Sequence, residues 1–192
     1  MIGIIDYGAG NVRSIELAFE RLGYSTLRTA NKGLLGACDH LIFPGVGHAK
    51  SAKENLEKSG VLPFLKEATQ PVLGICLGMQ LMCQSTEEGE VEGLGIFETK
   101  VKRFREAERI PHMGWNSVAF NGSPLFKGIK PESDFYFVHA YYAEESPDTI
   151  AKSVYPKPFT AALAKSNFYG VQFHPERSGK AGQQLIQNFL AL

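Results

Sequence analysis

The first half of the chain alternates between short apolar runs and longer segments in which apolar residues recur with a helical period. Short runs with few polar positions predict strands that are buried on both faces, and we find four: Met1–Asp6, Tyr24–Arg28, His40–Phe43 and Val72–Ile75. The periodic segments predict helices: Asn11–Leu22, Ala49–Lys58, Val61–Ala68 and Leu77–Gln84. This alternation favours an α/β fold in which helices cover both faces of a parallel sheet.

The second half has a different pattern, with aromatic and β-branched runs that predict further strands. Phe135–Tyr142 and Phe168–Phe173 are two such runs. Ala161–Ala164 could be strand or helix, and we interpret it as a strand because the turn-like segment Lys165–Asn167 follows it. Gly179–Leu192 predicts a closing amphipathic helix. The sheet is therefore expected to be mixed.

Composition and charge narrow the class of protein. A chain of 192 residues without a linker or repeat suits a single α/β domain, residues 1–192. The chain has 20 lysine and arginine residues and 20 aspartate and glutamate residues, so its formal net charge is zero. This balance gives no reason to expect nucleic acid or an anionic membrane as partner. The sequence lacks an 18-residue apolar run and a signal-peptide layout, and its three cysteines lack metal-site spacing. We expect a cytoplasmic domain without a metal site.

Cys76 carries the strongest chemical signal. It lies between glycines in Gly74-Ile75-Cys76-Leu77-Gly78, directly after a predicted strand and before a predicted helix. Such a turn is a nucleophile elbow, which exposes its side chain at the carboxyl end of a sheet. The amino end of the following helix favours the thiolate form. The alternative is a buried structural cysteine, the commoner fate of a free thiol.

His174 is the best candidate for a base that activates this thiol. It follows the predicted strand that ends at Phe173, and Glu176 lies two residues further on. In extended backbone these two side chains point to the same side, so the carboxylate can fix the imidazole tautomer. Cys76, His174 and Glu176 therefore form a candidate catalytic triad. The alternative is a surface His-Pro-Glu turn.

Donors for a developing oxyanion are expected from the Pro44–Gly47 loop, which follows another strand at the same sheet edge. The backbone amides of Gly47 and Leu77 are the candidate donors, and Gly45 permits close approach of substrate. The alternative for this loop is an ordinary strand-to-helix turn. Gln80 lies one helical turn beyond Cys76, so its side chain faces the same way and is a candidate substrate contact.

The remaining motifs give weaker evidence of a functional site. Gly8-Ala9-Gly10-Asn11 suggests phosphate binding, but Arg13 stands where a third glycine would complete a dinucleotide fingerprint, so no cofactor is expected. Cys83, two turns beyond the elbow, is expected in the core. His112 and His139 are expected in the core or at an interface, because neither has a carboxylate two residues away.

The motifs taken together resemble a known family. Gly74–Gln80, Pro44–Gly47 and Gln172–Glu176 resemble class I glutamine amidotransferases of the triad type. Pro111–Asn116 and Tyr136–His139 resemble the glutaminase subunits of imidazole glycerol phosphate synthases, which serve histidine biosynthesis. The resemblance covers nearly the whole chain. It implies a flavodoxin-like fold with a mostly parallel mixed sheet.

The resemblance also implies a reaction and a partner. Cys76 would attack the side-chain amide of L-glutamine, and His174 would protonate the leaving ammonia. Water would then hydrolyse the glutamyl thioester to glutamate. Ammonia would pass to a separate (β/α)₈ synthase subunit, in a heterodimer that makes imidazole glycerol phosphate and an aminoimidazole carboxamide ribotide.

The resemblance places four residues on the face toward that subunit: Asn11, Trp115, Tyr136 and Arg177. An exposed Trp115 would be an aromatic anchor, whereas a buried one would be core packing. Two other enzymes remain open alternatives: a stand-alone γ-glutamyl cysteine hydrolase, and a paralogous amidotransferase that serves sugar amidation. A catalytically idle regulatory or scaffold protein is a third, which the intact Cys-His-Glu set disfavours.

Overall fold

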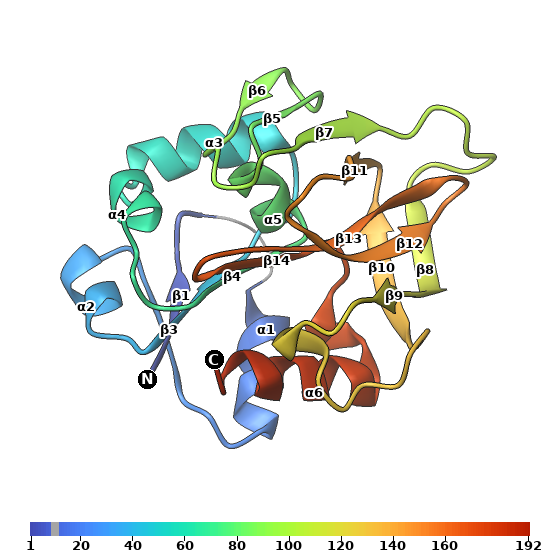
Figure 1. The fold of residues 1–192 in the computed structure, drawn as a ribbon. Helices are drawn as coiled ribbons and strands as arrows, with labels where there is room; N and C mark the ends of the chain where they lie inside the picture. The colour runs from blue at the N-terminus through green and yellow to red at the C-terminus, as the bar shows by residue number, and fades with distance from the viewer. Residues whose placement is uncertain (9–11) are drawn as a thin grey trace.

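One large mixed sheet, flanked by helices, forms the centre of the computed structural model, which describes residues 1–8 and 12–192 (Figure 1). Its parallel half runs in the order β2 (Thr26–Thr29), β1 (Ile2–Ile5), β3 (His40–Phe43), β4 (Val72–Ile75) and β14 (Phe168–Val171). This is the strand order of flavodoxin-like sheets. Asn11, predicted to face a partner, lies outside the described residues.

Beyond β14 the sheet continues through β13 (Pro158–Lys165), β11 (Tyr141–Ala143), β7 (Lys100–Arg103), β5 (Ser85–Thr86) and β6 (Val91–Glu92). These neighbours pair antiparallel, except that β5 and β7 are parallel. Strand β12 (Thr149–Val154) pairs with β13 and with β9 (Ala119–Phe120). A separate antiparallel pair joins β8 (His112–Ser117) to β10 (Asp134–His139). The predicted mixed α/β sheet is confirmed.

Helices cover both faces of the sheet, as the alternating pattern predicted (Figure 1). On one face lie α1 (Arg13–Arg21) and α6 (Gly179–Phe189). On the other lie α2 (Lys32–Gly36), α3 (Ala49–Lys58), α4 (Leu62–Lys66) and α5 (Leu77–Met82). Two short 3₁₀ helices, η1 (Pro124–Phe126) and η2 (Pro175–Arg177), lie in the second half of the chain. Within the described ranges, no helix combines the length and the apolar character needed to cross a bilayer.

Two hydrophobic clusters result from the two-residue period of the strands. In β4, Leu73 and Ile75 point into the cluster under α1 and α6, whereas Val72 points into the cluster under α2 to α5. In β3, Ile42 faces the first cluster and Phe43 the second. Both faces of β4 are therefore covered, which explains why it lacks polar residues.

The ends of several elements differ from the prediction. Helix α5 stops at Met82 instead of Gln84, because Cys83 is extended and the Gln84 N–H donates to the Thr99 carbonyl. Strand β2 begins at Thr26 instead of Tyr24, after a turn at Gly23 with φ of 84°. Helix α6 ends at Phe189, where the prediction extended to Leu192.

The prediction of one strand over Phe135–Tyr142 is wrong. The segment forms two strands in different sheets, since β10 pairs with β8 and β11 pairs with β7 and β13. The break falls at Ala140, whose carbonyl accepts from the Phe104 N–H. This change of sheet carries Val138, His139 and Tyr141 to the carboxyl end of β4.

Candidate active site

Cys76 lies at the turn between β4 and α5, with a backbone φ of 53° and ψ of −111°. Positive φ is rare outside glycine and is typical of a strained nucleophile elbow. The turn is tightly packed, because a Cβ on Gly78 would lie 2.0 Å from the Phe43 carbonyl oxygen. A Cβ on Gly45 would lie 2.2 Å from the Gly78 nitrogen. Glycines at these positions let the 44–47 loop rest directly on the elbow.

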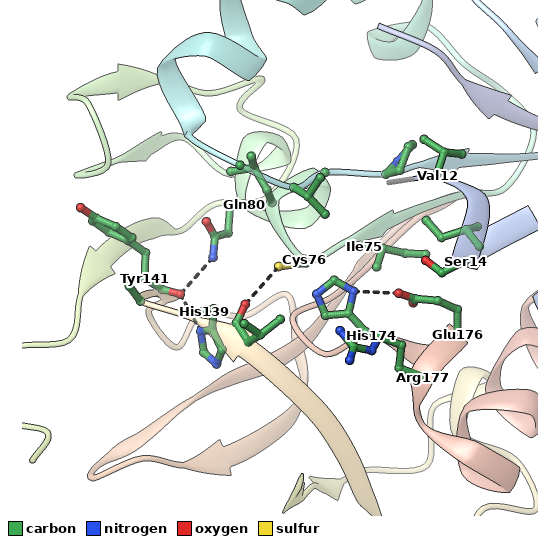
Figure 2. Close-up of a pocket in the computed structure, with 18 of the residues that line it drawn as sticks. Val12, Ser14, Ile75, Cys76, Gln80, His139, Tyr141, His174, Glu176 and Arg177 are labelled. Carbon is green, nitrogen blue, oxygen red and sulfur yellow. Dashed lines mark hydrogen bonds and ion pairs between the residues drawn. The ribbon is translucent and has the colours of Figure 1, made fainter. Parts of the chain in front are cut away.

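The imidazole of His174 lies between the sulfur of Cys76 and the carboxylate of Glu176 (Figure 2). Nδ1 of His174 is 2.9 Å from Oε1 of Glu176, and the side chains are only 7% and 3% exposed. An ionised carboxylate only accepts, so Nδ1 carries the proton of that bond. Nε2 has no hydrogen bond of good geometry within the described residues. With Nδ1 turned to Glu176, Nε2 lies on the side of the ring that faces the Cys76 sulfur (Figure 2).

The surroundings of His174 strongly favour its protonated form. Burial by itself lowers the pKa of this imidazole, but interactions with Cys76 and Glu176 outweigh burial and raise the pKa to about 10. Such an imidazole can take a proton from a thiol and hold it for a leaving group.

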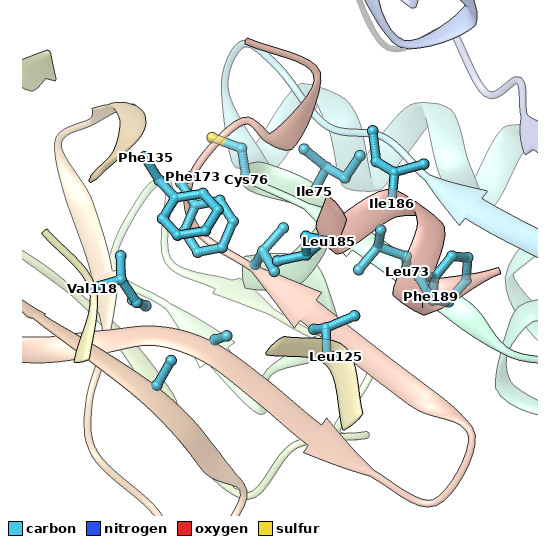
Figure 3. Close-up of a cluster of buried hydrophobic side chains, with 14 of the residues drawn as sticks. Leu73, Ile75, Cys76, Val118, Leu125, Phe135, Phe173, Leu185, Ile186 and Phe189 are labelled. Carbon is cyan, nitrogen blue, oxygen red and sulfur yellow. The ribbon is translucent and has the colours of Figure 1, made fainter. Parts of the chain in front are cut away.

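Packing holds the segment that carries His174. Phe173 packs against Phe135 with ring centroids 4.1 Å apart, next to Cys76 in the first cluster (Figure 3). The His174 N–H donates to the Tyr136 carbonyl at 2.9 Å, and the Ser178 hydroxyl donates to the His174 carbonyl at 2.6 Å. The backbone at His174, beyond the end of β14, is thus held by β10 and by Ser178, which follows η2.

A pocket of about 600 Å³ opens beside the thiol. The candidate triad lines it together with the other residues predicted to act there: Gly45, Gly47, Leu77 and Gln80. Gly47 has a φ of 94°, a conformation that glycine adopts without strain. In the described part of the chain, no group of three or more His, Cys, Asp or Glu side chains is placed to hold a metal ion.

The side-chain amide of Gln80 donates hydrogen bonds within the protein. Its Nε2 donates to the Tyr141 carbonyl and to Oε1 of Gln172, both at 2.9 Å, and the residue is 4% exposed. Both amide hydrogens are therefore occupied, and the carbonyl oxygen is the atom that could accept from a substrate.

Comparison with known proteins identifies the family. The model of the family "Glutamine amidotransferase class-I" matches residues 3–192. This chain is a class I glutamine amidotransferase by family. Two curated relatives carry the name imidazole glycerol phosphate synthase subunit HisH. The Bacteroides fragilis protein is 52% identical, with 100% of this chain and 99% of the relative covered. The Haemophilus influenzae protein is 48% identical, with 98% and 96% covered.

Solved structures agree on the fold of this amidotransferase. A crystal structure described as glutamine amidotransferase superposes with a TM-score of 0.78 at 18% identity, covering 99% of this chain and 97% of that chain. A glutamine amidotransferase from Thermotoga maritima gives a TM-score of 0.67 at 16% identity, covering 99% and 82%. At such low identity these structures show the fold alone.

Glu88 was missed by the sequence analysis, yet it lines the pocket of the amidotransferase. Its Oε2 accepts from the Ala49 N–H at 2.9 Å, which holds the carboxylate against the start of α3. In the sequence Glu88 belongs to a charged segment that is typical of a solvated loop. Only its neighbours from α3 and the 44–47 loop reveal it as part of the site.

Three of the predicted partner-facing residues form one surface group near the pocket. Trp115 of β8 is 58% exposed, and its ring lies edge-on to Tyr136, with centroids 6.0 Å apart. The Arg177 guanidinium lies 4.2 Å from the centre of the Tyr136 ring, a cation–π contact, and Arg177 also lines the pocket. Met113, two residues before Trp115 on the same strand face, is 63% exposed. The group is continuous from β8 to the pocket rim.

His112 and His139 are buried neighbours, with Nδ1 of His112 3.0 Å from Nε2 of His139. Burial lowers the pKa of His112 to about 4 and, opposed by a hydrogen bond to the Tyr141 carbonyl, lowers that of His139 to about 3. Both are therefore neutral near pH 7, in contrast to His174. Cys83 is also fully buried in the core, as predicted, and burial raises the pKa of its thiol.

Proposed function

We propose that this chain is the glutaminase subunit of an imidazole glycerol phosphate synthase, acting in histidine biosynthesis in the cytoplasm. On this proposal residues 1–192 act as one glutaminase domain that hydrolyses L-glutamine to glutamate and ammonia. The observation that carries the proposal is the buried His174–Glu176 pair beside the elbow thiol of Cys76. The relatives that are about half identical over their full length supply the choice of synthase.

The proposed first step forms a covalent intermediate. His174 Nε2 takes the Cys76 proton, and the sulfur attacks the side-chain amide carbon of glutamine. The amides of Gly47 and Leu77 donate to the resulting oxyanion, a contribution of roughly 3–4 kcal/mol per donor. The C–N bond then breaks, His174 gives its proton to the leaving nitrogen, and ammonia departs from a glutamyl thioester.

The second step regenerates the thiol. His174 removes a proton from water, which attacks the thioester carbonyl at the same oxyanion donors. Glutamate leaves, and the sulfur recovers its proton from His174. The Glu176 carboxylate stabilises the imidazolium in both steps.

The proposed substrate contacts follow from charge. The α-ammonium of glutamine needs a negative acceptor, and the Glu88 carboxylate is the pocket group that suits it. Gln80 offers its carbonyl oxygen to the same part of the substrate, and the backbone at Gly45 permits close approach.

The proposed partner is the (β/α)₈ synthase subunit, bound as a heterodimer. The exposed aromatic and apolar side chains of β8, Trp115 and Met113, are of the kind that anchors protein interfaces. Their continuity with Tyr136 and Arg177 supports a docking face that reaches the rim of the pocket. Ammonia would leave the pocket towards this face.

The test is release of ammonia and glutamate from glutamine in three samples: the chain alone, the chain with the synthase subunit and its ribotide ligand, and Cys76→Ser with the same partner. We expect low activity alone, strong activation by the liganded partner, and none in Cys76→Ser. Full activity without a partner would instead indicate a stand-alone hydrolase. Activation only by a barrel subunit of sugar amidation would indicate the paralogue.

A further inference from the structure

Gln172 carries a buried side-chain amide that has no role in the two proposed reaction steps. Its side chain is fully buried, and Nε2 lies 3.6 Å from the sulfur of Cys76, within hydrogen-bond range for sulfur. It is absent from the described residues that line the pocket. Gln172 therefore approaches the thiol from the protein interior and not from the pocket.

The orientation of this amide is determined by its neighbours. The Tyr141 carbonyl can only accept, so the Gln80 atom 2.9 Å away must be the Gln80 nitrogen. The same nitrogen lies 2.9 Å from one end of the Gln172 amide, which must therefore be the oxygen. The other end of the Gln172 amide, directed at the sulfur, is then an N–H donor.

Rigid elements on three sides hold this arrangement. Gln80 belongs to α5, Gln172 follows β14, and the Tyr141 carbonyl lies at the start of β11. That carbonyl also accepts from Nδ1 of His139 at 2.7 Å, so both of its lone pairs are used (Figure 2). The His139 ring is held in turn by His112. Rotation of the Gln172 amide would break the bond to Gln80.

An N–H donor at this position favours the thiolate form of Cys76. An N–H donor stabilises a thiolate more than a neutral thiol, because hydrogen bonds to charged acceptors are the stronger ones. The nearby Val138 carbonyl, 3.9 Å from the sulfur, can only accept and therefore favours the thiol. Of these two contacts, Gln172 is the one that favours the reactive form.

We propose that Gln172 is a positioning residue for Cys76: its amide N–H, oriented by Gln80, fixes the sulfur and favours the thiolate. The inference rests on the proposed function in one respect only, that Cys76 is the nucleophile. It assigns to Gln172 a role separate from substrate binding, and it explains why the amide hydrogens of Gln80 are directed into the protein.

The test uses the isolated chain and the rate of Cys76 alkylation by iodoacetamide as a function of pH, followed by mass spectrometry of the Cys76 peptide. Gln172→Met keeps the shape of the side chain but removes the donor. We expect the midpoint of the alkylation profile to rise by about one pH unit, which corresponds to about 1.4 kcal/mol. With the synthase partner, kcat should fall about tenfold while KM changes less than about twofold.

Gln172→Glu reverses the polarity of the contact. It keeps the shape better than methionine but places a carboxylate beside the sulfur, so we expect a larger upward shift than in Gln172→Met. A glutamate variant without a shift would show that this end of the side chain does not reach the sulfur. This readout remains if Gln172→Met fails to fold.

Asn188→Ala is the matched control, because the Asn188 amide bonds the carbonyls of Leu125 and Lys127 away from the pocket. It should destabilise the chain without moving the alkylation midpoint. An unchanged midpoint in both Gln172 variants, or an equal shift in Asn188→Ala, would overturn the inference. Alkylation needs no glutamine, so a shifted midpoint in a chain without glutaminase activity would overturn the proposed function alone.

Discussion

His174 and Glu176, two residues apart in the sequence, form a buried ion-pair-type contact of 2.9 Å between Nδ1 and Oε1. The carboxylate leaves Nε2 facing Cys76, and it is one of the two partners that raise the pKa of the imidazole to about 10 despite burial. This contact distinguishes His174 from the other buried histidines near the pocket.

Replacing Glu176 by glutamine should remove the charge but keep the size. We expect kcat with the synthase partner to fall about 100-fold or more, because the imidazolium loses its stabilising carboxylate. The His174 pKa, followed by NMR titration, should fall in the same variant. Glu98→Gln, at a surface pair with Lys165, is the control and should leave both measurements unchanged.

His174→Asn should abolish glutaminase turnover, whereas His139→Asn should leave a large share of it. The reason is that His139, although it lines the pocket, is neutral and donates to the Tyr141 carbonyl. Steady-state kinetics with the partner measure both. Equal losses would contradict the assignment of His174 as the base.

Acid should destabilise the chain through His112 and His139. Their pKa values are lowered in the folded state from about 6.5 to about 4 and about 3. Below pH 6.5 the unfolded chain therefore binds protons that the folded chain does not, and the free energy of unfolding falls as pH falls towards 4. Urea unfolding at pH 7, 6 and 5 measures the slope.

The double variant His112→Phe, His139→Phe keeps aromatic packing and should show a shallower acid slope than the wild type. His48→Asn is the control, since His48 caps α3 at the surface and asparagine can replace that cap. A slope in the double variant as steep as in the wild type would assign the acid sensitivity to other groups.

Gly78→Ala should destabilise the fold by about 3 kcal/mol or more, the upper range for overpacking. The added Cβ would lie 2.0 Å from the Phe43 carbonyl oxygen, which is backbone and cannot rotate away. Gly122→Ala is the control, because a Cβ there meets nothing within 4 Å. Chemical denaturation of both variants measures the difference, and equal stabilities would contradict the tight elbow packing.

Trp115→Ala should weaken binding of the synthase subunit by about 30-fold or more, the range of interface hot spots. Alkylation of Cys76 in the isolated chain should be unaffected. Leu34→Ala is the control, because Leu34 is also exposed but lies on α2, at the opposite end of the sheet from β8 (Figure 1). Similar dissociation constants for the two variants would show that the β8 face does not bind the partner.

Features that depend on a few neighbouring residues can be predicted from the amino-acid sequence. The Gly-flanked Cys76 requires a strained turn, and the spacing of His174 and Glu176 sets their contact, because backbone geometry acts over two to four residues. Short apolar runs likewise predict parallel strands that are covered on both faces, because each run is a local pattern.

Contacts at the Cys76 sulfur between residues far apart in the sequence arise from the folding of the whole chain. Gln172 lies 96 positions from Cys76, and Gln80 lies 61 positions from Tyr141, so their contacts depend on the order of strands in the sheet. The same holds for Glu88. Its sequence context predicts a solvent-exposed loop, whereas in the structure it lines the pocket. The hydrophobic pattern and the residue propensities predict whether a segment is helix or strand and which of its residues are buried. They do not predict which segments touch, because contacts between segments are set by the packing of the whole chain.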